Sequence, residues 1–246
     1  MKKLNAFQLK IICVILMVLD HIDPFVPNMV SAIAHVISRV VSPIFAYFVV
    51  EGLFYTRNLK KYNFRLWSWA IVMAVGNNII NTMYSAKQVH VYNNIFMTLA
   101  CGLTMLTFIH CGRKLEKVCE NRFKKIGFYV LAILVATFGM MQEGAQVVLP
   151  VMLISYFFRD NNKKKYIGYS ILSILLFSIS FVDYGNLKDT LLMLAYNSDF
   201  MFILALPLLG MYNGLRGPNT KFNKYFFYIF YPLHLWIIAT LQYWRG

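Results

Sequence analysis

The sequence has few charged residues and very few acidic ones. Only 14% of its 246 residues are charged, and 24 Lys and Arg face 10 Asp and Glu. A soluble domain is about a quarter charged and just under half apolar, whereas 59% of this chain is hydrophobic. A soluble core of this size cannot cover so much apolar side chain with so few polar groups. The composition excludes an ordinary soluble domain and predicts a protein embedded in lipid.

Cysteines and long polar segments are scarce as well. The four cysteines, Cys13, Cys101, Cys111 and Cys119, show no CxxC spacing, so we expect free thiols. Histidines and carboxylates show no close ligand spacing, and no metal site is predicted. No loop is long enough to form a separate soluble domain. Residues 1–246 are therefore expected to form a single transmembrane domain.

Long apolar runs, in contrast, are abundant. Each approaches the roughly 20 residues that an α-helix needs to cross a bilayer core. Strands of membrane barrels alternate polar and apolar residues, which these nearly continuous runs do not. The predicted fold class is all-α, a polytopic bundle of about nine transmembrane helices, with eight or ten as alternatives. The expected spans are 7–26, 31–56, 66–84, 94–111, 126–142, 144–158, 166–182, 199–212 and 225–243.

The excess of positive charge is a topology signal. Lys and Arg cluster at every second gap between the apolar runs, and short basic loops stay cytoplasmic during insertion. We therefore expect a multi-pass protein of the cell membrane with a cytoplasmic N-terminus. The partner of these charges is the anionic lipid surface rather than nucleic acid. The clusters are Lys2, Lys3 and Lys10; Arg57, Lys60, Lys61 and Arg65; Arg113, Lys114, Lys117, Arg122, Lys124 and Lys125; Arg159, Lys163, Lys164 and Lys165; and Arg216, Lys221 and Lys224.

Ionisable side chains inside the first apolar run are candidates for function. Such a side chain costs at least about 2.5–3.5 kcal/mol at bilayer depth, so it usually faces the interior of a bundle. Asp20 and His21 stand in this run, with Asp23 close by. Lys10 precedes His21 by eleven residues, which places both on nearly the same helix face, about 16 Å apart. This suits a ligand with a phosphate head and a long arm, such as acetyl-CoA. The alternative is that Lys10 anchors the helix end and His21 makes an interhelical hydrogen bond.

The second apolar run carries an arginine at about the depth of Asp20. We expect Arg39 and Asp20 to form an ion pair, which offsets their shared desolvation. His35 lies one turn from Arg39 on the same helix face, and Glu51 lies near the cytosolic end of the run. A purely structural salt bridge is the alternative account of Arg39.

Polar groups also occur in later apolar runs. Asn77 and Asn81 are spaced to join helices through hydrogen bonds inside a membrane. Pro232 kinks the last run, and His234 then lies near the middle of the membrane. A buried histidine is poised for proton transfer near neutral pH, although a single one is more often part of a packed core.

The order of these motifs resembles that of the TraX family, membrane proteins named for the acetylation of conjugative pilin. The motifs are Lys10 with His21, SRVVSPIFAYFVVEG at 38–52, NIFMTLACGL at 94–103 and FYPLHLWII at 230–238. The resemblance covers essentially the whole chain. More distantly, the basic residue ahead of a histidine is similar to a signature of the acyltransferase-3 membrane family.

The resemblance implies a membrane acetyltransferase that draws acetyl-CoA from the cytosol. His21 becomes the catalytic candidate and Lys10 the cation on the CoA side, with Asp20, Arg39, Glu51 and His234 as further candidates for the active site. Arg39 is a candidate for stabilising the oxyanion, and Arg57 and Arg65, in the basic loop at 57–65, are expected to bind CoA phosphates together with the loop at 113–125. The acceptor is an amine or hydroxyl on the extracytoplasmic side, in a protein N-terminus, a sugar or a lipid.

Two other functional classes use the same buried residues. A transporter or lipid-handling protein would use Asp20, Arg39, Glu51 and His234 as a path for substrate or protons. A non-catalytic membrane scaffold would tolerate substitution of both His21 and His234. Binding of acetyl-CoA distinguishes the acetyltransferase from both.

Overall fold

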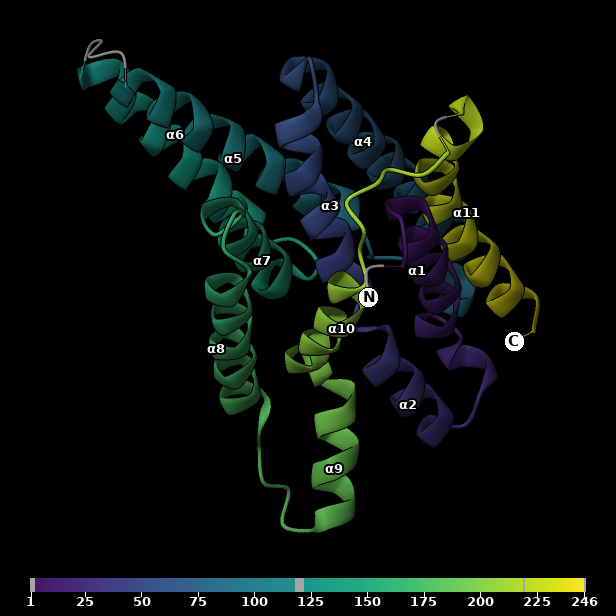
Figure 1. Cartoon of the computed structure of the whole chain (residues 1–246). Helices are drawn as coiled ribbons and strands as arrows, with labels where there is room; N and C mark the ends of the chain where they lie inside the picture. Colours follow the sequence, from purple (N-terminus) through teal and green to yellow (C-terminus); the bar gives the residue numbers. More distant parts are fainter. Residues whose placement is uncertain (1–2, 118–121, 219, 246) are drawn as a thin grey trace. The chain divides into compact units, whose positions relative to one another are not determined.

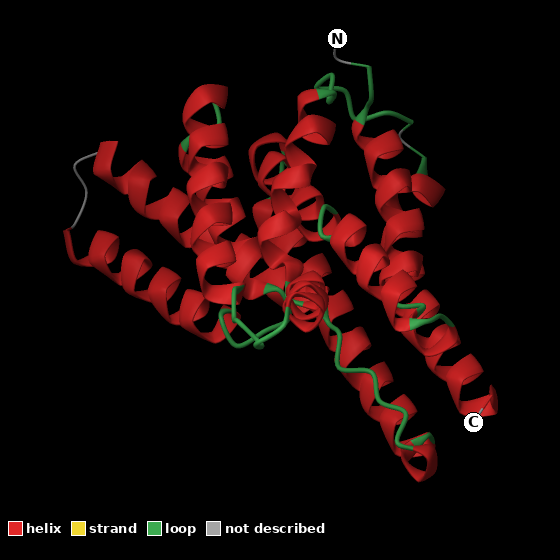
Figure 2. Ribbon diagram, turned by 90° about the horizontal axis from the view of Figure 1, so that it is seen from below, coloured by secondary structure: helices red, strands yellow, loops and turns green. Residues whose placement is uncertain are grey.

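The computed structural model describes residues 3–117, 122–218 and 220–245. Lys2 and Cys119 lie outside them, as do the side chains of Lys117, Lys221 and Lys224. Within the described ranges the chain forms helices and loops without a strand, which confirms the all-α fold class (Figure 2). Figure 1 follows the α-helices α1 (Ala6–Asp20), α2 (Asn28–Ser38), α3 (Val41–Tyr55), α4 (Leu59–Met83), α5 (Ile95–Lys117), α6 (Arg122–Gly139), α7 (Ala145–Phe157), α8 (Asn162–Ser180), α9 (Leu187–Tyr196), α10 (Ala205–Gly210) and α11 (Lys221–Arg245). Short 3-10 helices cover Asp23–Phe25, Ser85–Lys87 and Ser198–Leu204.

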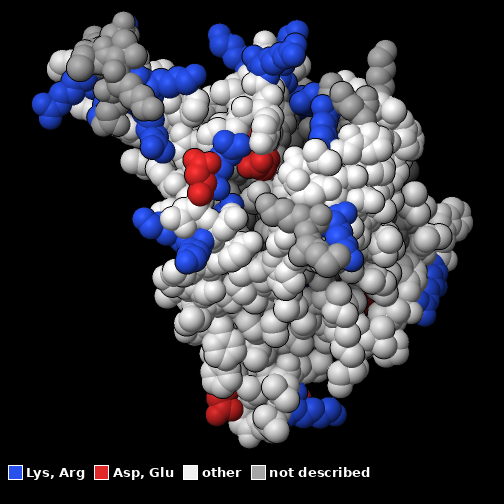
Figure 3. All heavy atoms as spheres, viewed as in Figure 1, with Lys and Arg blue, Asp and Glu red and all other residues white. Residues whose placement is uncertain are grey.

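Few of these helices have the length and hydropathy of a membrane span. Among the described residues, Asn28–Tyr55, which covers α2 and α3, and Ile95–Leu115 within α5 do. A third span results if Leu187–Tyr196 and Ser198–Gly210, which meet at a bend of 63°, are taken together. The predicted count of nine is therefore not supported, and the cytoplasmic N-terminus stays a prediction. On the face drawn in Figure 3, uncharged side chains nevertheless cover most of the surface.

The physical reasons for this difference lie in the individual helices. The helices α1 and α7 have only 15 and 13 residues. Asparagines in α4, aromatic and polar side chains in α11 and the lysines at the start of α8 lower the hydropathy of these three. The expected span at 199–212 is instead a 3-10 helix followed by α10, and α9 occupies residues that the sequence analysis left between spans.

The chain divides into two compact units. The first consists of Met1–Phe45, Val75–Tyr92 and Tyr166–Gly246, and the second of Ala46–Ala74 and Asn93–Lys165. Each unit is discontinuous in sequence, because α3, α4 and α8 each contribute to both. The single domain expected for residues 1–246 stays a prediction.

In the first unit, the start of α1 is fixed by its own cap and by the loop that precedes α11. Asn5 and Gln8 form a capping box, in which each side chain accepts a hydrogen bond from the other's backbone N–H. The N–H of Ala6 donates to the carbonyl of Leu215 at 2.9 Å. Gly217 has φ +83°, and a Cβ there would lie 2.7 Å from Oδ1 of Asn5, so this close contact requires glycine.

The end of α4 packs closely against α11, also in the first unit. A Cβ at Gly76 would lie 2.0 Å from the ring of Trp236, so the ring occupies the space that glycine leaves. Nε1 of Trp236 donates to Oδ1 of Asn77 at 2.9 Å. The amide of Asn81 donates to the carbonyl of Val91 and accepts from its N–H. Asn77 therefore joins two helices, as the sequence predicted, while Asn81 instead fixes the loop after α4.

In the second unit, α5 and α6 lie side by side along most of their length (Figure 1). Polar residues tie α4 to α5: Thr104 donates to Asn63 at 2.8 Å, and Nε1 of Trp67 donates to Thr104 at 3.0 Å. A Cβ at Gly102 would lie 2.4 Å from Sδ of Met152, so α5 and α7 approach closely at that glycine.

Candidate functional site

The predicted site lies where α1 ends. Asp20 is the last residue of α1, and His21 caps it with its N–H bonded to the carbonyl of Val18 at 3.2 Å. The 3-10 helix that starts at Asp23 and Pro24 then turns the chain into α2. Proline fixes φ and carries no N–H, which suits this sharp reversal. The helix end therefore projects several polar side chains towards α2.

An ion-pair network joins α1, the end of α2 and the segment after α9. Nη2 of Arg39 lies 3.0 Å from Oδ1 of Asp20, and Nη1 lies 3.1 Å from Oδ1 of Asp199. Nε of Arg39 donates to the carbonyl of His35 at 3.1 Å, and Ser38 donates to Asp20. The predicted pair of Arg39 with Asp20 is confirmed, and Asp199 adds a second carboxylate.

His35 lies between two carboxylates of the same network. Its Nδ1 is 2.9 Å from Oδ1 of Asp20, and its Nε2 is 3.0 Å from Oδ2 of Asp23. Ser31 donates to the other oxygen of Asp23. The network thus holds three carboxylates and one guanidinium: Asp20 and Asp199 contact Arg39, and Asp23 contacts His35. With neutral histidines the cluster carries net negative charge, which favours a cationic group beside it.

His21 meets a second histidine from α11. The ring centroids of His21 and His234 are 5.5 Å apart, with 44° between the ring planes. Nδ1 of His234 is 3.1 Å from the carbonyl of Phe230. Because a carbonyl only accepts, Nδ1 is the donor, and in the neutral ring Nε2 carries a lone pair.

Nε2 of His234 is buried without a hydrogen-bond partner within the described ranges, and the whole residue is only 6% exposed. On the other ring, Nε2 of His21 lies 4.0 Å from Oδ2 of Asp20, which is too long for a hydrogen bond but close enough for electrostatic attraction. The two rings and this carboxylate place an acceptor nitrogen beside acidic groups, an arrangement able to take up and release protons.

Comparison with known proteins now places the chain. The family described as TraX protein matches residues 6–242. The chain belongs to the TraX family. A protein of Dichelobacter nodosus named "Probable fimbrial assembly protein FimC, serogroup H1" is 24% identical over 250 residues, which cover 97% of this chain and 96% of that protein. No solved structure matches the chain. The likeness to the acyltransferase-3 family stays a prediction.

In this TraX family member, Lys10 contacts the same helix as His21. Nζ of Lys10 lies 5.5 Å from the ring centroid of Phe227, and His21 meets His234 seven residues later. Contacts therefore advance along α1 and α11 in the same direction, and the two helices are parallel. The shared helix face predicted for Lys10 and His21 is confirmed, while their roles stay predictions.

Three predicted site residues belong to the second unit of the TraX family member. Oε1 of Glu51 lies 3.3 Å from Nε of Arg159, whose guanidinium lies 4.3 Å from the ring centroid of Phe54. Burial lowers the pKa of Arg159, but the Glu51 carboxylate outweighs it, so the pKa is raised. Arg65 stacks over the Tyr62 ring at 5.4 Å. Arg57 is exposed in the turn after α3.

The sequence analysis did not assign His35 and Asp199 to the site. The spacing of His35 and Arg39 placed them on one helix face, which was a usable signal. Asp199 had none, because it lies 160 residues from Arg39 in the sequence. Among the residues that the structure describes, no group of three or more His, Cys, Asp and Glu is arranged to hold a metal ion.

Proposed function

We propose that this protein is a multi-pass acetyltransferase of the cell membrane. It moves the acetyl group of cytosolic acetyl-CoA to an amine or hydroxyl of an acceptor on the extracytoplasmic side. The observation that carries the proposal is the contact of His21 with His234, whose Nε2 is buried and finds no hydrogen-bond partner in the described chain. A buried polar atom without a partner costs about 1–3 kcal/mol, so its retention favours a role in binding or proton transfer.

The proposed chemistry is a single acyl transfer assisted by the histidine pair. The acceptor nitrogen or oxygen bonds to the thioester carbonyl carbon while a histidine Nε2 takes its proton. The carbon–sulfur bond then breaks, and the imidazolium returns the proton to the CoA thiolate. The products are the acetylated acceptor and free CoA. His21 is the proposed base, with His234 beside it to accept or relay the proton.

The network around Arg39 is better suited to positioning than to direct catalysis. Its guanidinium already binds Asp20 and Asp199, and its Nε binds the carbonyl of His35. A donor held by two carboxylates is poorly placed to stabilise a new oxyanion. We therefore assign Arg39 and Asp20 the role of fixing the end of α1, and so the orientation of His21.

On the donor side, the proposal uses Lys10 as the cation nearest to the histidine pair along α1. Arg57 and Arg65 are proposed to bind the phosphates of CoA, since basic loops attract polyanions. Acetyl-CoA enters as the acyl-donor substrate and leaves as CoA.

The proposed topology keeps nine spans with the N-terminus in the cytoplasm. Parallel α1 and α11 support an odd number of crossings, because two spans that run in the same direction are separated by an even number of reversals. A third contact agrees with the parallel alignment. Nη1 of Arg245, the last residue of α11, donates to the carbonyl of Pro24, shortly after the end of α1, at 3.0 Å.

A part in building a surface appendage is a coarser proposal, supported by the name of the protein from Dichelobacter nodosus. That protein is named for fimbrial assembly, and the full-length match makes a shared process reasonable for this chain.

The test measures release of free CoA from acetyl-CoA by purified protein in nanodiscs, with small amines and hydroxyl compounds as acceptors. Wild type is compared with His21→Ala, His21→Gln and His234→Gln. General acid–base assistance typically contributes about 10²- to 10⁴-fold, so each variant is expected to lose at least about a hundredfold while thermal unfolding shows a folded protein. Equal CoA release by wild type and all three variants would disprove the proposed role of the histidines. Absence of both CoA release and acetyl-CoA binding would favour the transporter.

A further inference from the structure

Both ring nitrogens of His35 face carboxylates. Nδ1 lies 2.9 Å from Oδ1 of Asp20, the last residue of α1, and Nε2 lies 3.0 Å from Oδ2 of Asp23 in the 3-10 helix that follows. An ionised carboxylate only accepts hydrogen bonds, and a neutral imidazole has only one N–H. Both contacts are therefore hydrogen bonds only when His35 is protonated, with an N–H on each nitrogen. In that form the histidine ties α2 to the end of α1 and to the turn at once.

The neutral form of His35 finds a different partner for the same nitrogen. Nη2 of Arg39 also lies 2.9 Å from Nδ1, and a guanidinium only donates. In the neutral ring Nδ1 accepts from Arg39, while the N–H of Nε2 keeps its bond to Asp23. Protonation thus exchanges one hydrogen bond at Nδ1 for another within the same arrangement of side chains. His35 takes up or releases a single proton without breaking the network.

The charges around His35 favour the protonated form. With neutral histidines, three carboxylates and one guanidinium leave the network with two negative charges in excess, and a proton on His35 removes one of them. Arg39 opposes this proton only in part, because Asp199 holds its Nη1 at 3.1 Å. The groups that face the ring are Asp20 from α1, Asp23 from the turn, Arg39 from α2 itself and Tyr196 from α9.

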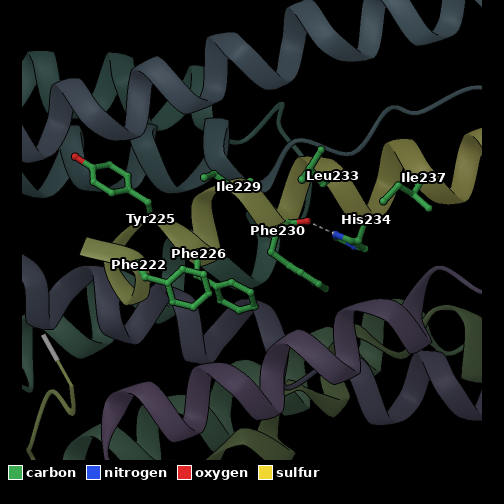
Figure 4. A pocket seen from close by; sticks show the side chains of 8 residues that line it. All are labelled: Phe222, Tyr225, Phe226, Ile229, Phe230, Leu233, His234 and Ile237. Carbon is green, nitrogen blue, oxygen red and sulfur yellow. Dashed lines mark hydrogen bonds between the residues drawn. The ribbon is translucent and has the colours of Figure 1, made fainter. Parts of the chain in front are cut away.

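His21 lies at the other oxygen of the same carboxylate. Its Nε2 is 4.0 Å from Oδ2 of Asp20, whereas His35 contacts Oδ1. On the side of α11, His21 meets His234, whose Nδ1 donates to the Phe230 carbonyl (Figure 4). The carboxylate contact of His21 is longer than both contacts of His35, so the first proton goes to His35. The other groups close enough to act on the charge of His21 are Asp23, His35 and Arg39.

We propose that His35 is a positioning residue that holds a proton beside Asp20 and thereby keeps His21 neutral. This inference rests on the proposed acetyltransferase function, in which His21 takes the proton of the acceptor and must be neutral to do so. Two cations at one carboxylate repel each other, so a second proton on His21 is disfavoured while His35 is charged. The base therefore stays in its reactive form at lower pH than it would without His35.

The first measurement follows the protonation of each histidine directly. Full-length protein with ¹⁵N in its five histidine rings is titrated in nanodiscs by solid-state NMR, which distinguishes protonated from bare ring nitrogens. His21→Gln and His35→Gln assign the two signals. We expect His35 to gain its second N–H at higher pH than His21. Protonation of His21 before His35 in wild type would overturn the proposal, whatever the variants do.

Substitution of His35 separates its charge from its shape. His35→Gln removes the charge and keeps a hydrogen-bonding side chain, whereas His35→Lys keeps a permanent cation. The matched control is His90→Gln, which changes an exposed histidine of the same unit. We expect the pH at which His21 is half protonated to rise by about one unit in His35→Gln. It should stay at or below the wild-type value in His35→Lys and match wild type in His90→Gln.

The acidic limb of the pH profile of CoA release reports the same equilibrium during turnover, because a protonated His21 cannot act as the base. It is expected to move to higher pH by about one unit in His35→Gln but not in His35→Lys. Equal titration of His21 in wild type and His35→Gln would overturn the proposal. Equal shifts in the Gln and Lys variants would also overturn it, since they would show that shape rather than charge matters. The expected titrations in a protein that releases no CoA with any acceptor would instead refute the acetyltransferase and retain the coupling of the two histidines.

Discussion

Replacing Arg39 by methionine tests whether the network at the end of α1 holds the site together. The guanidinium binds Asp20 at 3.0 Å, Asp199 at 3.1 Å and the His35 carbonyl at 3.1 Å. The two carboxylates are only 24% and 25% exposed, so removing the cation leaves both poorly solvated. Breaking a buried pair by removing one partner typically costs about 3–5 kcal/mol. Because each carboxylate keeps some contact with solvent, we expect Arg39→Met to lower the free energy of unfolding by about 3 kcal/mol.

The measurement is unfolding of the purified protein by a denaturing detergent, followed through tryptophan fluorescence. Asp199→Asn in the Arg39→Met background removes one of the two carboxylate charges that have lost Arg39 and is expected to restore at least about 1 kcal/mol. The same change in wild type removes a favourable contact and is expected to destabilise. A double-mutant cycle with additive effects, or an Arg39→Met protein as stable as wild type, would refute the network as a determinant of stability.

Two further predictions concern packing and the second unit. Gly76→Ala forces the Trp236 ring away, because its Cβ would lie 2.0 Å from that ring, and is expected to cost about 1–3 kcal/mol in the same unfolding assay. Gly127→Ala, where a Cβ meets nothing described within 4 Å, is expected to be neutral or stabilising by up to about 1 kcal/mol, so equal effects at both sites would contradict the packing argument. Glu51→Gln is expected to cost about 1.5–3 kcal/mol through its ion pair with Arg159. Combining it with Arg159→Gln should cost no more than the worse single variant, and a fully additive loss would show that the pair is not coupled.

Much of the helical architecture was readable from apolar runs. Each predicted span overlaps a helix or a pair of helices, since continuous apolar sequence without alternation excludes strands. The break at Arg39 and Val40 was not predicted, because hydropathy averages over a single polar residue. The helix α9 was missed because it is amphipathic and so does not form a continuous apolar run. Its start is marked by a local cap, in which the Asn186 side chain accepts from the N–H of Asp189.

The candidate site was predictable in part. The pair of Arg39 with Asp20 followed from matching depths in two helices joined by a short turn, and the structure confirms it. The contact of His21 with His234 spans almost the whole chain, so no periodicity links the two residues. Only their shared property, an ionisable ring in an apolar run, singled both out. The third partner of the network, Asp199, lies at the start of the predicted span 199–212, and nothing in its local sequence links it to Arg39, 160 residues away.

The contrast between Arg39 and His234 separates structural from functional polarity in this site. The guanidinium of Arg39 has a carboxylate on each Nη and a carbonyl on Nε, as expected of a group whose task is to fix a helix end. His234 is linked to this network through His21. Its Nε2 has no partner in the described chain although the residue is almost fully buried. Its Nδ1 bond to Phe230 fixes the tautomer that leaves this lone pair open. If His234 serves packing alone, His234→Leu leaves turnover nearly unchanged and gains stability, because the desolvated Nε2 is removed. A histidine retained for proton transfer would gain stability in the same exchange and lose turnover, so measuring both on His234→Leu distinguishes the two roles.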